Sequence, residues 1–414
     1  PGQAAAPRPG GGGMSGRISV DVAIIGGGLV GSSAALALRG MGFSVALLDK
    51  GFCGAQASGV NYGGVRRQGR PVEQLPLAAR ASAVWVRLRG LIGIDGEYQR
   101  SGHLKLAQTE ADMSALEAYA ETVAGYGLDL QLLSAGGLRQ RFPWIGDGLA
   151  GASFCPSDGH ANPRLVAAGF PAAARRAGVQ VFEQTPVIGV TRQAEGFALE
   201  TETGPSVRAG TVINAAGAWA APFAASFGEA LPLKRIYPSM IVTEPLPPLM
   251  DVNIGMEGGG IYARQVERGN CIVGGERGQA LPDPDFSRPR SAGALAIMNR
   301  AAEIFPALKH AHAIRFWTGT EGATPDKNPI IGPSTTTPGL IHAFGFTGAG
   351  FQIAPGVGEV LADLVRDGRT QTPIHAFSPA RFLARRAAAS LATNGQAQDQ
   401  QNDQKSEQRE GFAS

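Results

Sequence analysis

Three glycines near the start of the chain have the spacing of a loop that binds a dinucleotide: Gly26, Gly28 and Gly31. In such a loop the first glycine permits a tight turn and the second lets the backbone approach the pyrophosphate. The third allows a helix to pack closely on a strand. The pyrophosphate then rests on the positively polarised N-terminus of that helix. Asp49 stands at the spacing expected for a carboxylate that binds ribose hydroxyls.

The elements that must position these residues are also visible in the sequence. Residues 18–25 are apolar and β-rich and predict a strand, and residues 30–40 have the spacing of a helix. Residues 44–48 predict a second buried strand that ends at Asp49. A glycine turn that serves packing alone is the alternative. Strand, turn, helix and terminal acid in this order favour a dinucleotide site instead.

The composition of the segment 51–67 favours FAD over a nicotinamide cofactor. It is rich in Gly, Ala, Ser and Asn, whereas a nicotinamide enzyme normally continues with further helices and parallel strands. A loop of this composition can wrap an extended cofactor with backbone N–H groups and small hydroxyls. FAD needs such a loop because its flavin ring lies far from its adenosine. We therefore predict that the cofactor is FAD.

Length and composition limit the class of protein. The chain has 414 residues, of which 43% are hydrophobic and 17% charged, and this predicts two joined globular domains. A formal net charge of +3 gives no case for nucleic acid or an anionic membrane as a partner. Cys53, Cys155 and Cys271 are far apart without a CxxC spacing, which argues against a zinc site or a disulfide framework. We expect no metal and a reducing compartment.

No segment of the sequence predicts a membrane anchor. The apolar stretch 20–48 is interrupted by glycines, serines and Arg39, and its period changes from strand to helix. No secretory signal is evident before Met14. We expect a cytoplasmic protein by default.

Four blocks in the same order resemble the D-amino-acid-oxidase-like (DAO) superfamily of flavoproteins. This superfamily includes glycine and sarcosine oxidases and the flavin subunits of D-amino-acid, hydroxyproline or opine dehydrogenases. The resemblance covers about residues 18–385. Its blocks are 26–31 with 49–50 and 57–66, then 212–219, then 324–332, and finally 345–355. The sequence departs from many relatives at Ala349, where they have a histidine beside the flavin, and this leaves the electron acceptor open.

The resemblance implies an α/β FAD-binding domain of the Rossmann-like, glutathione-reductase type and an α+β substrate domain with a large antiparallel sheet. Each domain is expected to consist of non-contiguous segments. The expected limits are 18–92, 153–231 and 312–385 for the FAD-binding domain, 93–152 and 232–311 for the substrate domain, 1–17 for a disordered extension or tag, and 394–414 for a disordered tail.

Further contacts with FAD are expected in the matched blocks. The backbone N–H groups of 348–352 would offset negative charge on the reduced flavin, backed by a helix that begins near Pro355. The other expected FAD contacts are Lys50, Ser58, Asn61, Gly63, Gly64, Val187, Ala216, Gly217, Trp219, Gly348, Gly350, Phe351 and Gln352.

An amino-acid substrate also needs a cation for its carboxylate, ideally an arginine that binds it with two hydrogen bonds. Arg264 lies in a predicted strand of the substrate domain, where Tyr262 would add a hydroxyl. The resemblance implies the same role for Arg66 or Arg67, in the loop that passes near the flavin. We expect Glu321 either to contact the substrate amine or to form a structural ion pair. His160 is expected to help a turn that caps the following helix.

The leading hypothesis is oxidation of an amino acid or secondary amine that bears a carboxylate, with hydride transfer from the α-carbon to flavin N5 and hydrolysis of the imine. Candidate substrates are D-amino acids, sarcosine, hydroxyproline-like imino acids and opines. One alternative is an FAD-dependent 2-hydroxy-acid dehydrogenase, which would need a base for the hydroxyl proton. Another is a flavin-bearing assembly subunit with little activity alone. A partner subunit, a quinone or another electron acceptor remains open.

Overall fold

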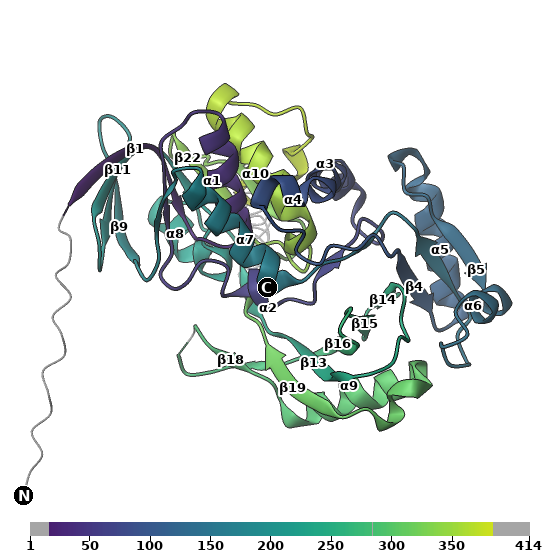
Figure 1. Ribbon diagram of the computed structural model, residues 1–414. Coiled ribbons are helices and arrows are strands. Elements are labelled where there is room, and N and C mark those ends of the chain that lie inside the picture. Colours follow the sequence, from purple (N-terminus) through teal and green to yellow (C-terminus); the bar gives the residue numbers. More distant parts are fainter. Residues whose placement is uncertain (1–15, 284, 384–414) are drawn as a thin grey trace, which may run out of the picture.

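The computed structural model describes residues 16–283 and 285–383. The extension and the tail expected at 1–17 and 394–414 lie outside the described residues, apart from residues 16 and 17. Figure 1 shows two β-layers. One is covered by α1, α7 and α10, and the other lies beside α9.

The first layer is an eight-stranded sheet. Five of its strands run parallel, and one edge strand, β21, pairs antiparallel with β22. An antiparallel ribbon of β9 (Val187–Arg192) and β10 (Phe197–Thr201) branches from β11. In spatial order the other strands are β21 (Ile330–Pro333), β22 (Leu340–Phe344), β11 (Ser206–Asn214), β1 (Arg17–Ile25), β2 (Val45–Leu48) and β8 (Gln180–Phe182).

Helices that cross between these strands bury the face of the first sheet. α1 packs against α10 so closely that a Cβ atom on Gly358 would lie 2.5 Å from Ser33 Oγ. Trp85 and Phe170 are fully buried in this core. The elements concerned are α1 (Leu29–Gly40), α2 (Ala57–Val60), η1 (Val72–Gln74), α3 (Leu75–Val86), α4 (Leu88–Ile92), α7 (Pro163–Arg176), η3 (Gly217–Trp219), α8 (Ala220–Ser226), α10 (Gly350–Asp367) and η5 (His375–Phe377).

The second layer is an eight-stranded sheet, which we call the substrate sheet, and it is antiparallel except where β14 runs parallel to β4. Its separate apolar core includes Phe142 and Phe305. Its strands in spatial order are β19 (Ala313–Thr318), β13 (Pro238–Pro245), β16 (Asn270–Arg277), β15 (Tyr262–Gln265), β14 (Asn253–Met256), β4 (His103–Ala107), β6 (Gly151–Cys155) and β5 (Gln131–Ser134). The elements beside it are α5 (Glu110–Thr122), η2 (Ala124–Tyr126), α6 (Ala135–Arg141), α9 (Ser291–Ile304) and η4 (Pro306–His310).

Three short two-stranded ribbons lie outside the two large sheets. They pair β3 (Gly64–Val65) with β7 (Gly159–His160), β12 (Lys234–Ile236) with β20 (Glu321–Ala323), and β17 (Gln279–Ala280) with β18 (Ser287–Arg288). The expected α/β cofactor sheet and large antiparallel sheet are both present. The domain limits stay a prediction. β19 is hydrogen-bonded to β13 of the substrate sheet, although its residues fall within the expected FAD-binding segment 312–385.

The start of one predicted helix differs from that observed. The helix expected to begin near Pro355 begins at Gly350, so Pro355 lies inside α10. Proline removes one helical hydrogen bond. Side chains of the neighbouring helices bond to carbonyl groups of this turn: Ser33 Oγ donates to Ala354 O at 3.0 Å and Trp85 Nε1 donates to Gln352 O at 2.8 Å.

Two features of the described residues concern ligands and membranes. Among residues 16–283 and 285–383, no helix has the length and apolar character needed to cross a membrane. The same residues contain no group of three or more His, Cys, Asp or Glu side chains placed to hold a metal ion, and Cys53, Cys155 and Cys271 are free thiols.

Candidate active site

The glycine turn excludes side chains where a pyrophosphate would lie. Gly26 has a φ of +107°, and a Cβ atom there would lie 2.3 Å from the carbonyl oxygen of Ala215. A Cβ atom on Gly31 would lie 1.9 Å from the carbonyl oxygen of Gly26. Gly28 is the N-cap residue of α1 and contributes no side-chain cap. Backbone therefore forms the surface of this turn, as the approach of a phosphate requires.

Asp49 ends β2 directly against this turn. Its Oδ2 accepts a hydrogen bond from Gly27 N at 2.7 Å, and its Oδ1 accepts one from Gly51 N at 2.7 Å. Burial raises the pKa of Asp49, partly offset by these two hydrogen bonds and by the charge of Lys50. The carboxylate is thus held at the carboxyl end of β2, where a ribose-binding acid would stand.

The residues on the far side of the turn also fit a dinucleotide. The ammonium group of Lys50 lies over the indole ring of Trp219, 4.1 Å from the ring centroid. Trp219 Nε1 is buried, and no described residue accepts its hydrogen bond. A buried donor without an acceptor is costly, and a bound ligand with acceptor atoms would satisfy it. Lys50 also pairs with Asp285, at the tip of the β17–β18 hairpin of the substrate side.

The segment 57–66, which we call the cofactor loop, is fixed mainly by its own side chains. Ser58 Oγ accepts a hydrogen bond from Leu29 N at 2.8 Å, so the loop contacts the first residue of α1. Asn61 accepts a hydrogen bond from Gly63 N at 2.8 Å and donates to Ser58 O at 2.6 Å, which closes a turn in the loop. A Cβ atom on Gly64 would lie 3.4 Å from the ring of Tyr62. Of these expected FAD contacts, Asn61 is already satisfied within the loop.

The turn before α10 has strained backbone. Thr347 has a φ of +48° and Gly348 a φ of +80°. A left-handed threonine is uncommon, and such strain gathers at ligand sites. Gln352 is 1% exposed and its Nε2 donates to Ala78 O at 2.9 Å, while the Phe351 ring packs on Trp85. Both side chains point into the core, so only their backbone N–H groups can serve a cofactor.

Other expected FAD contacts lie at the carboxyl end of the first sheet or on its branch. Ala216 and Gly217 follow β11, and Gly217 has a φ of +56° with open space beside its Cα. A Cβ atom on Gly350 would meet the Cβ atom of Phe346 at 3.1 Å. Val187 begins β9 and is half-buried. All four roles stay predictions.

Polar side chains form a row between the cofactor loop and the substrate sheet. Arg66 acts electrostatically on Tyr62, and the rings of Tyr62 and Tyr262 meet edge to face with their centroids 4.7 Å apart. Tyr262 in turn interacts electrostatically with Glu321, the first residue of β20. Arg66 thus acts on one tyrosine and Glu321 on the other, and the two tyrosine rings are in contact.

The backbone turn before α10 closes this row. The carboxylate of Glu321 accepts a hydrogen bond from Gly348 N, and the next carbonyl, Ala349 O, accepts one from Arg70 Nη2 at 3.3 Å. Arg70 Nε donates to Arg66 O at 2.8 Å, which completes the ring of contacts. We call this set the polar circuit. It comprises Arg66, Tyr62, Tyr262, Glu321, Gly348, Ala349 and Arg70.

The charges of the polar circuit are poorly compensated. Within the described residues, neither Arg66 nor Arg70 forms an ion pair with a carboxylate. Burial lowers the pKa of Arg66, opposed by Asp158 and two tyrosines. Burial and the neighbouring Arg66 lower the pKa of Arg70 to about 9. Burial raises the pKa of Glu321, partly offset by the Gly348 N–H and Arg277. Cations without a protein counter-ion beside a cofactor loop indicate an anionic ligand.

The other two predicted arginines have different surroundings. Arg67 Nη2 donates to Gly127 O at 2.8 Å and to Ser157 Oγ at 3.1 Å, toward η2 and the end of β6. Arg264 is 2% exposed and is bonded to the backbone of the cofactor loop through Tyr62 O. Arg66 and Arg264 both act electrostatically on Tyr62, and the Arg264 guanidinium lies 5.7 Å from the centroid of the Tyr62 ring.

Sequence reasoning missed Arg70, Tyr62 and His103. Arg70 lies four residues after Arg66, and Tyr62 lies within the glycine-rich loop, so both stood beside predicted positions. His103 is 3% exposed, and its Nδ1 lies 3.0 Å from Gln68 Oε1. Burial and the charges of Arg66, Lys105 and Arg70 lower its pKa well below its usual range. Nothing in the sequence around His103 distinguishes it.

His160 and Asn162 have different roles at the start of α7. Asn162 caps the helix, because its side chain accepts a hydrogen bond from Arg164 N at 3.1 Å. His160 instead lies on β7 and is 5% exposed, with its Nδ1 3.4 Å from Arg264 Nη1. The expectation that His160 serves the helix cap is therefore wrong, because its ring faces Arg264 and Asn162 forms the cap.

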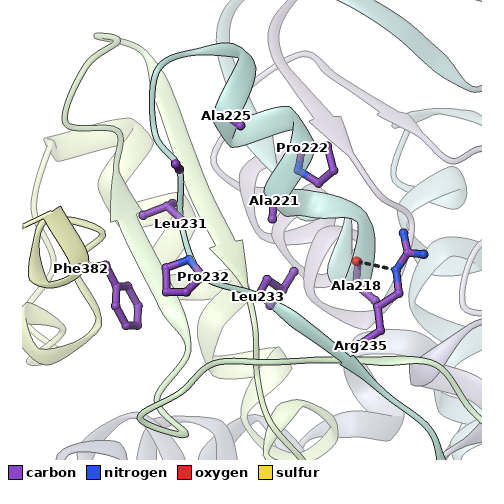
Figure 2. A pocket seen from close by; sticks show the side chains of 10 residues that line it. Ala218, Ala221, Pro222, Ala225, Leu231, Pro232, Leu233, Arg235 and Phe382 are labelled. Atoms are coloured by element: carbon purple, nitrogen blue, oxygen red, sulfur yellow. Dashed lines mark hydrogen bonds between the residues drawn. The ribbon is translucent and has the colours of Figure 1, made fainter. Parts of the chain in front are cut away.

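An apolar pocket of about 750 Å³ shares no lining residue with the polar circuit. Figure 2 shows Leu231, Pro232 and Phe382 on one side and Ala221 and Pro222 on the other, with Arg235 Nε bonded to Ala218 O at 3.3 Å. Arg235 is the only titratable side chain in its lining among the described residues. The pocket therefore lacks the groups that amine oxidation requires.

Comparisons with known proteins agree with this geometry. Residues 21–364 match the model of the DAO family, described as FAD dependent oxidoreductase. Glycine oxidase from Geobacillus kaustophilus (strain HTA426) is 29% identical over 373 residues, which cover 88% of this chain and 98% of that protein. One of the subunits of opine oxidase from Rhizobium meliloti is 29% identical over 383 residues, which cover 89% of this chain and 99% of that protein.

Solved structures give the same result. The crystal structure of glycine oxidase from Geobacillus kaustophilus has a TM-score of 0.82 at 28% identity and covers 87% of this chain and 98% of that chain. L-proline dehydrogenase from P. horikoshii has a TM-score of 0.82 at 26% identity and covers 89% of this chain and 99% of that chain. Because the family model matches more than half of the sequence, the chain belongs to the DAO family of FAD-dependent oxidoreductases.

Proposed function

We propose that the protein oxidises an amino acid or a secondary amine that bears a carboxylate, at the carbon beside the nitrogen. The observation that carries this proposal is the polar circuit, in which Arg66 has no described carboxylate partner and Glu321 stands at the other end of the row. A substrate with a carboxylate and an amine matches these two charges. Three relatives support the class, since their names refer to glycine, opines and L-proline.

Arg66 is proposed to bind the substrate carboxylate. A guanidinium group offers two parallel N–H donors to a carboxylate, and partial burial strengthens that interaction. Burial raises the pKa of both Tyr62 and Tyr262, so they remain neutral hydroxyl groups at physiological pH. The Tyr62 hydroxyl donates to Asn253 Oδ1 at 2.5 Å, so its ring would exclude water from the reacting carbon, whereas the Tyr262 hydroxyl would orient the substrate.

Glu321 is proposed to contact the substrate nitrogen. Loss of a hydride from the α-carbon requires an amine with a free electron pair, so the ammonium form must first give up a proton. A carboxylate with a raised pKa is better matched to accept that proton than an ordinary one. When bound, FAD would supply the hydride acceptor, and the imine product would then hydrolyse.

The cofactor contacts proposed for this chemistry are backbone groups. The first turn of α10 leaves N–H groups without acceptors inside the helix, and they follow the Gly348 turn. These groups would offset the negative charge of the reduced flavin. The turn at 26–31 and Asp49 would hold the pyrophosphate and a ribose.

Partner and compartment belong to the same proposal. One relative is named as a subunit of opine oxidase, which supports a partner subunit or another electron acceptor for this chain. The three widely spaced free thiols support a reducing, cytoplasmic compartment.

The test is anaerobic mixing of the flavin-loaded protein with separate amino acids, imino acids and 2-hydroxy acids, while the flavin absorbance is followed. We expect amines that carry a carboxylate to bleach the flavin, and the 2-hydroxy acids to leave it oxidised. If only 2-hydroxy acids bleach the flavin, the proposal is wrong and the protein is a 2-hydroxy-acid dehydrogenase instead. Failure of every compound, with the flavin still reducible by dithionite, would favour an assembly subunit.

A further inference from the structure

Arg264 extends from β15 of the substrate sheet into the cofactor loop. Its Nε donates a hydrogen bond to Tyr62 O at 2.8 Å, and its Nη1 lies 3.4 Å from Nδ1 of His160. Its Nη2 lies 2.9 Å from the position that a Cβ atom on Gly63 would occupy. The side chain is thus bonded to the loop, with 2% of its surface exposed.

The charge of Arg264 has no counter-ion in the described part of the chain. Glu97 acts on it electrostatically without an ion pair, and Glu97 Oε2 accepts a hydrogen bond from Asn162 Nδ2 at 3.1 Å. Burial and Arg264 itself lower the pKa of His160 to about 3, so that ring is neutral. Burial lowers the pKa of Arg264 to about 10, opposed by Tyr62 and Glu97, so Arg264 is a cation at neutral pH.

The loop presents bare backbone to this cation. Gly63 has a φ of +93°, and a Cβ atom there would lie 2.3 Å from Ala161 O as well as against Arg264. No side chain can therefore separate the guanidinium group from the loop at this point. A buried cation whose hydrogen-bond partners are neutral and which forms no ion pair with a carboxylate is costly. Its cost is explained if the charge acts on a negative group that appears during the reaction.

We propose that Arg264 is a positioning residue that fixes the Tyr62–Gly63 segment of the cofactor loop and holds a positive charge behind it, which favours the reduced state of bound FAD over the oxidised state. Uptake of a hydride adds two electrons and one proton to the neutral oxidised flavin, and the product carries one negative charge while N1 remains unprotonated. A nearby buried cation stabilises that product more than the neutral reactant. This inference rests on FAD binding and not on the identity of the substrate.

The experiment measures the reduction potential of the flavin-loaded protein against a dye of known potential, in the wild type and in Arg264→Gln and Arg264→Lys. We expect Arg264→Gln to shift the equilibrium toward oxidised flavin about tenfold, which is about 30 mV for a two-electron couple. We expect Arg264→Lys, which keeps the charge, to stay close to the wild type. Arg87→Gln removes a largely exposed guanidinium group and should leave the potential unchanged.

Each outcome decides the matter. An unchanged potential in Arg264→Gln would overturn the proposal, and so would an equal fall in Arg264→Lys and Arg264→Gln. If Arg264→Gln does not retain FAD, Arg264→Met supplies the neutral variant for the same measurement. Loss of FAD from both variants with an unchanged melting temperature of the apoprotein would reduce Arg264 to an anchor of the loop. No substrate is used, so failure of the proposed amine oxidation would be recognised separately.

Discussion

The Glu321 carboxylate accepts a hydrogen bond from the backbone N–H of Gly348. This contact joins β20 to the strained turn that precedes α10, where Thr347 and Gly348 both have positive φ. It also places an acid with a raised pKa at one end of the polar circuit.

Replacement of Glu321 by glutamine should lower kcat/KM for the best amine substrate about 100-fold, because a proton acceptor for the substrate ammonium is lost. The wild type should lose activity as the pH falls through a pKa above the ordinary value of 4.5, since a raised pKa protonates the carboxylate at higher pH. The variant should lack this acid limb in a pH profile of kcat/KM. Glu303→Gln, on an exposed side chain, serves as the control. An acid limb that persists in Glu321→Gln would assign the proton transfer to another group.

Replacement of Arg66 by alanine should raise KM for a carboxylate-bearing substrate about 100-fold, the loss expected for a charged hydrogen-bonded partner. Arg67→Ala should change KM less than about threefold, because that guanidinium group is bonded to Gly127 O and Ser157 Oγ. Steady-state kinetics on both variants with matched FAD content is the measurement. Equal effects of the two substitutions would contradict the assignment of Arg66.

Gly31→Ala should abolish FAD retention, because the added Cβ atom would meet the Gly26 carbonyl oxygen at 1.9 Å. Gly40→Ala is a matched control on the same helix, since no atom lies within 4 Å of its Cβ position. The control should bind FAD normally and gain about 0.5–1 kcal/mol of stability from the better helix former. The ratio of flavin to protein absorbance after purification gives the readout. A yellow Gly31→Ala protein would show that the turn tolerates a side chain.

Glu229 and His342 form a fully buried pair, with Glu229 Oε2 2.8 Å from His342 Nε2. Burial opposes ionisation of Glu229, but hydrogen bonds from His342, Ser334 and Thr335 outweigh it and lower its pKa to about 2. Since the folded-state pKa lies below the ordinary value of 4.5, this contribution to stability is complete above that pH. It is lost as the pH falls toward 2, and it amounts to about 3 kcal/mol.

Glu229→Gln should therefore unfold at a lower urea concentration than the wild type at pH 7, and the difference should narrow as the pH is lowered. Fluorescence-monitored urea unfolding between pH 3 and pH 7 measures this. A constant difference across that range would show that the carboxylate charge does not contribute.

Much of the cofactor side could be predicted from local pattern alone. The spacing of Gly26, Gly28 and Gly31 follows directly from the geometry of a dinucleotide-binding turn. The change from strand to helical period around it predicted the limits of β1, α1 and β2 to within one residue. The start of α10 was misplaced because Pro355 usually marks a helix beginning, whereas here neighbouring side chains support the helix around it.

The residues of the substrate site were harder to predict, because their roles depend on which layer of the protein covers which face of the substrate sheet. Tyr262 and Arg264 are two residues apart on one strand, so their side chains share a face of the sheet. Both side chains contact Tyr62 of the cofactor loop, Arg264 at its carbonyl oxygen and Tyr262 at its ring. No local pattern in the sequence shows that this face of the strand meets the loop. Arg70 was not predicted because it lies in an irregular segment. Without a helical or strand period, the sequence does not show that Arg66 and Arg70 belong to the same site.

The packing of α1 against α10 bears on how the protein matures. α1 follows the glycine turn near the beginning of the chain, whereas α10 is the last long helix of the described residues. β1 likewise has β11 as a neighbour, a strand that emerges from the ribosome almost two hundred residues later. The nascent polypeptide thus carries its phosphate-binding motif without the partners that shape it until β11 and α10 have been synthesised. Flavin capture must wait for α10, and a chain arrested before α10 would remain colourless.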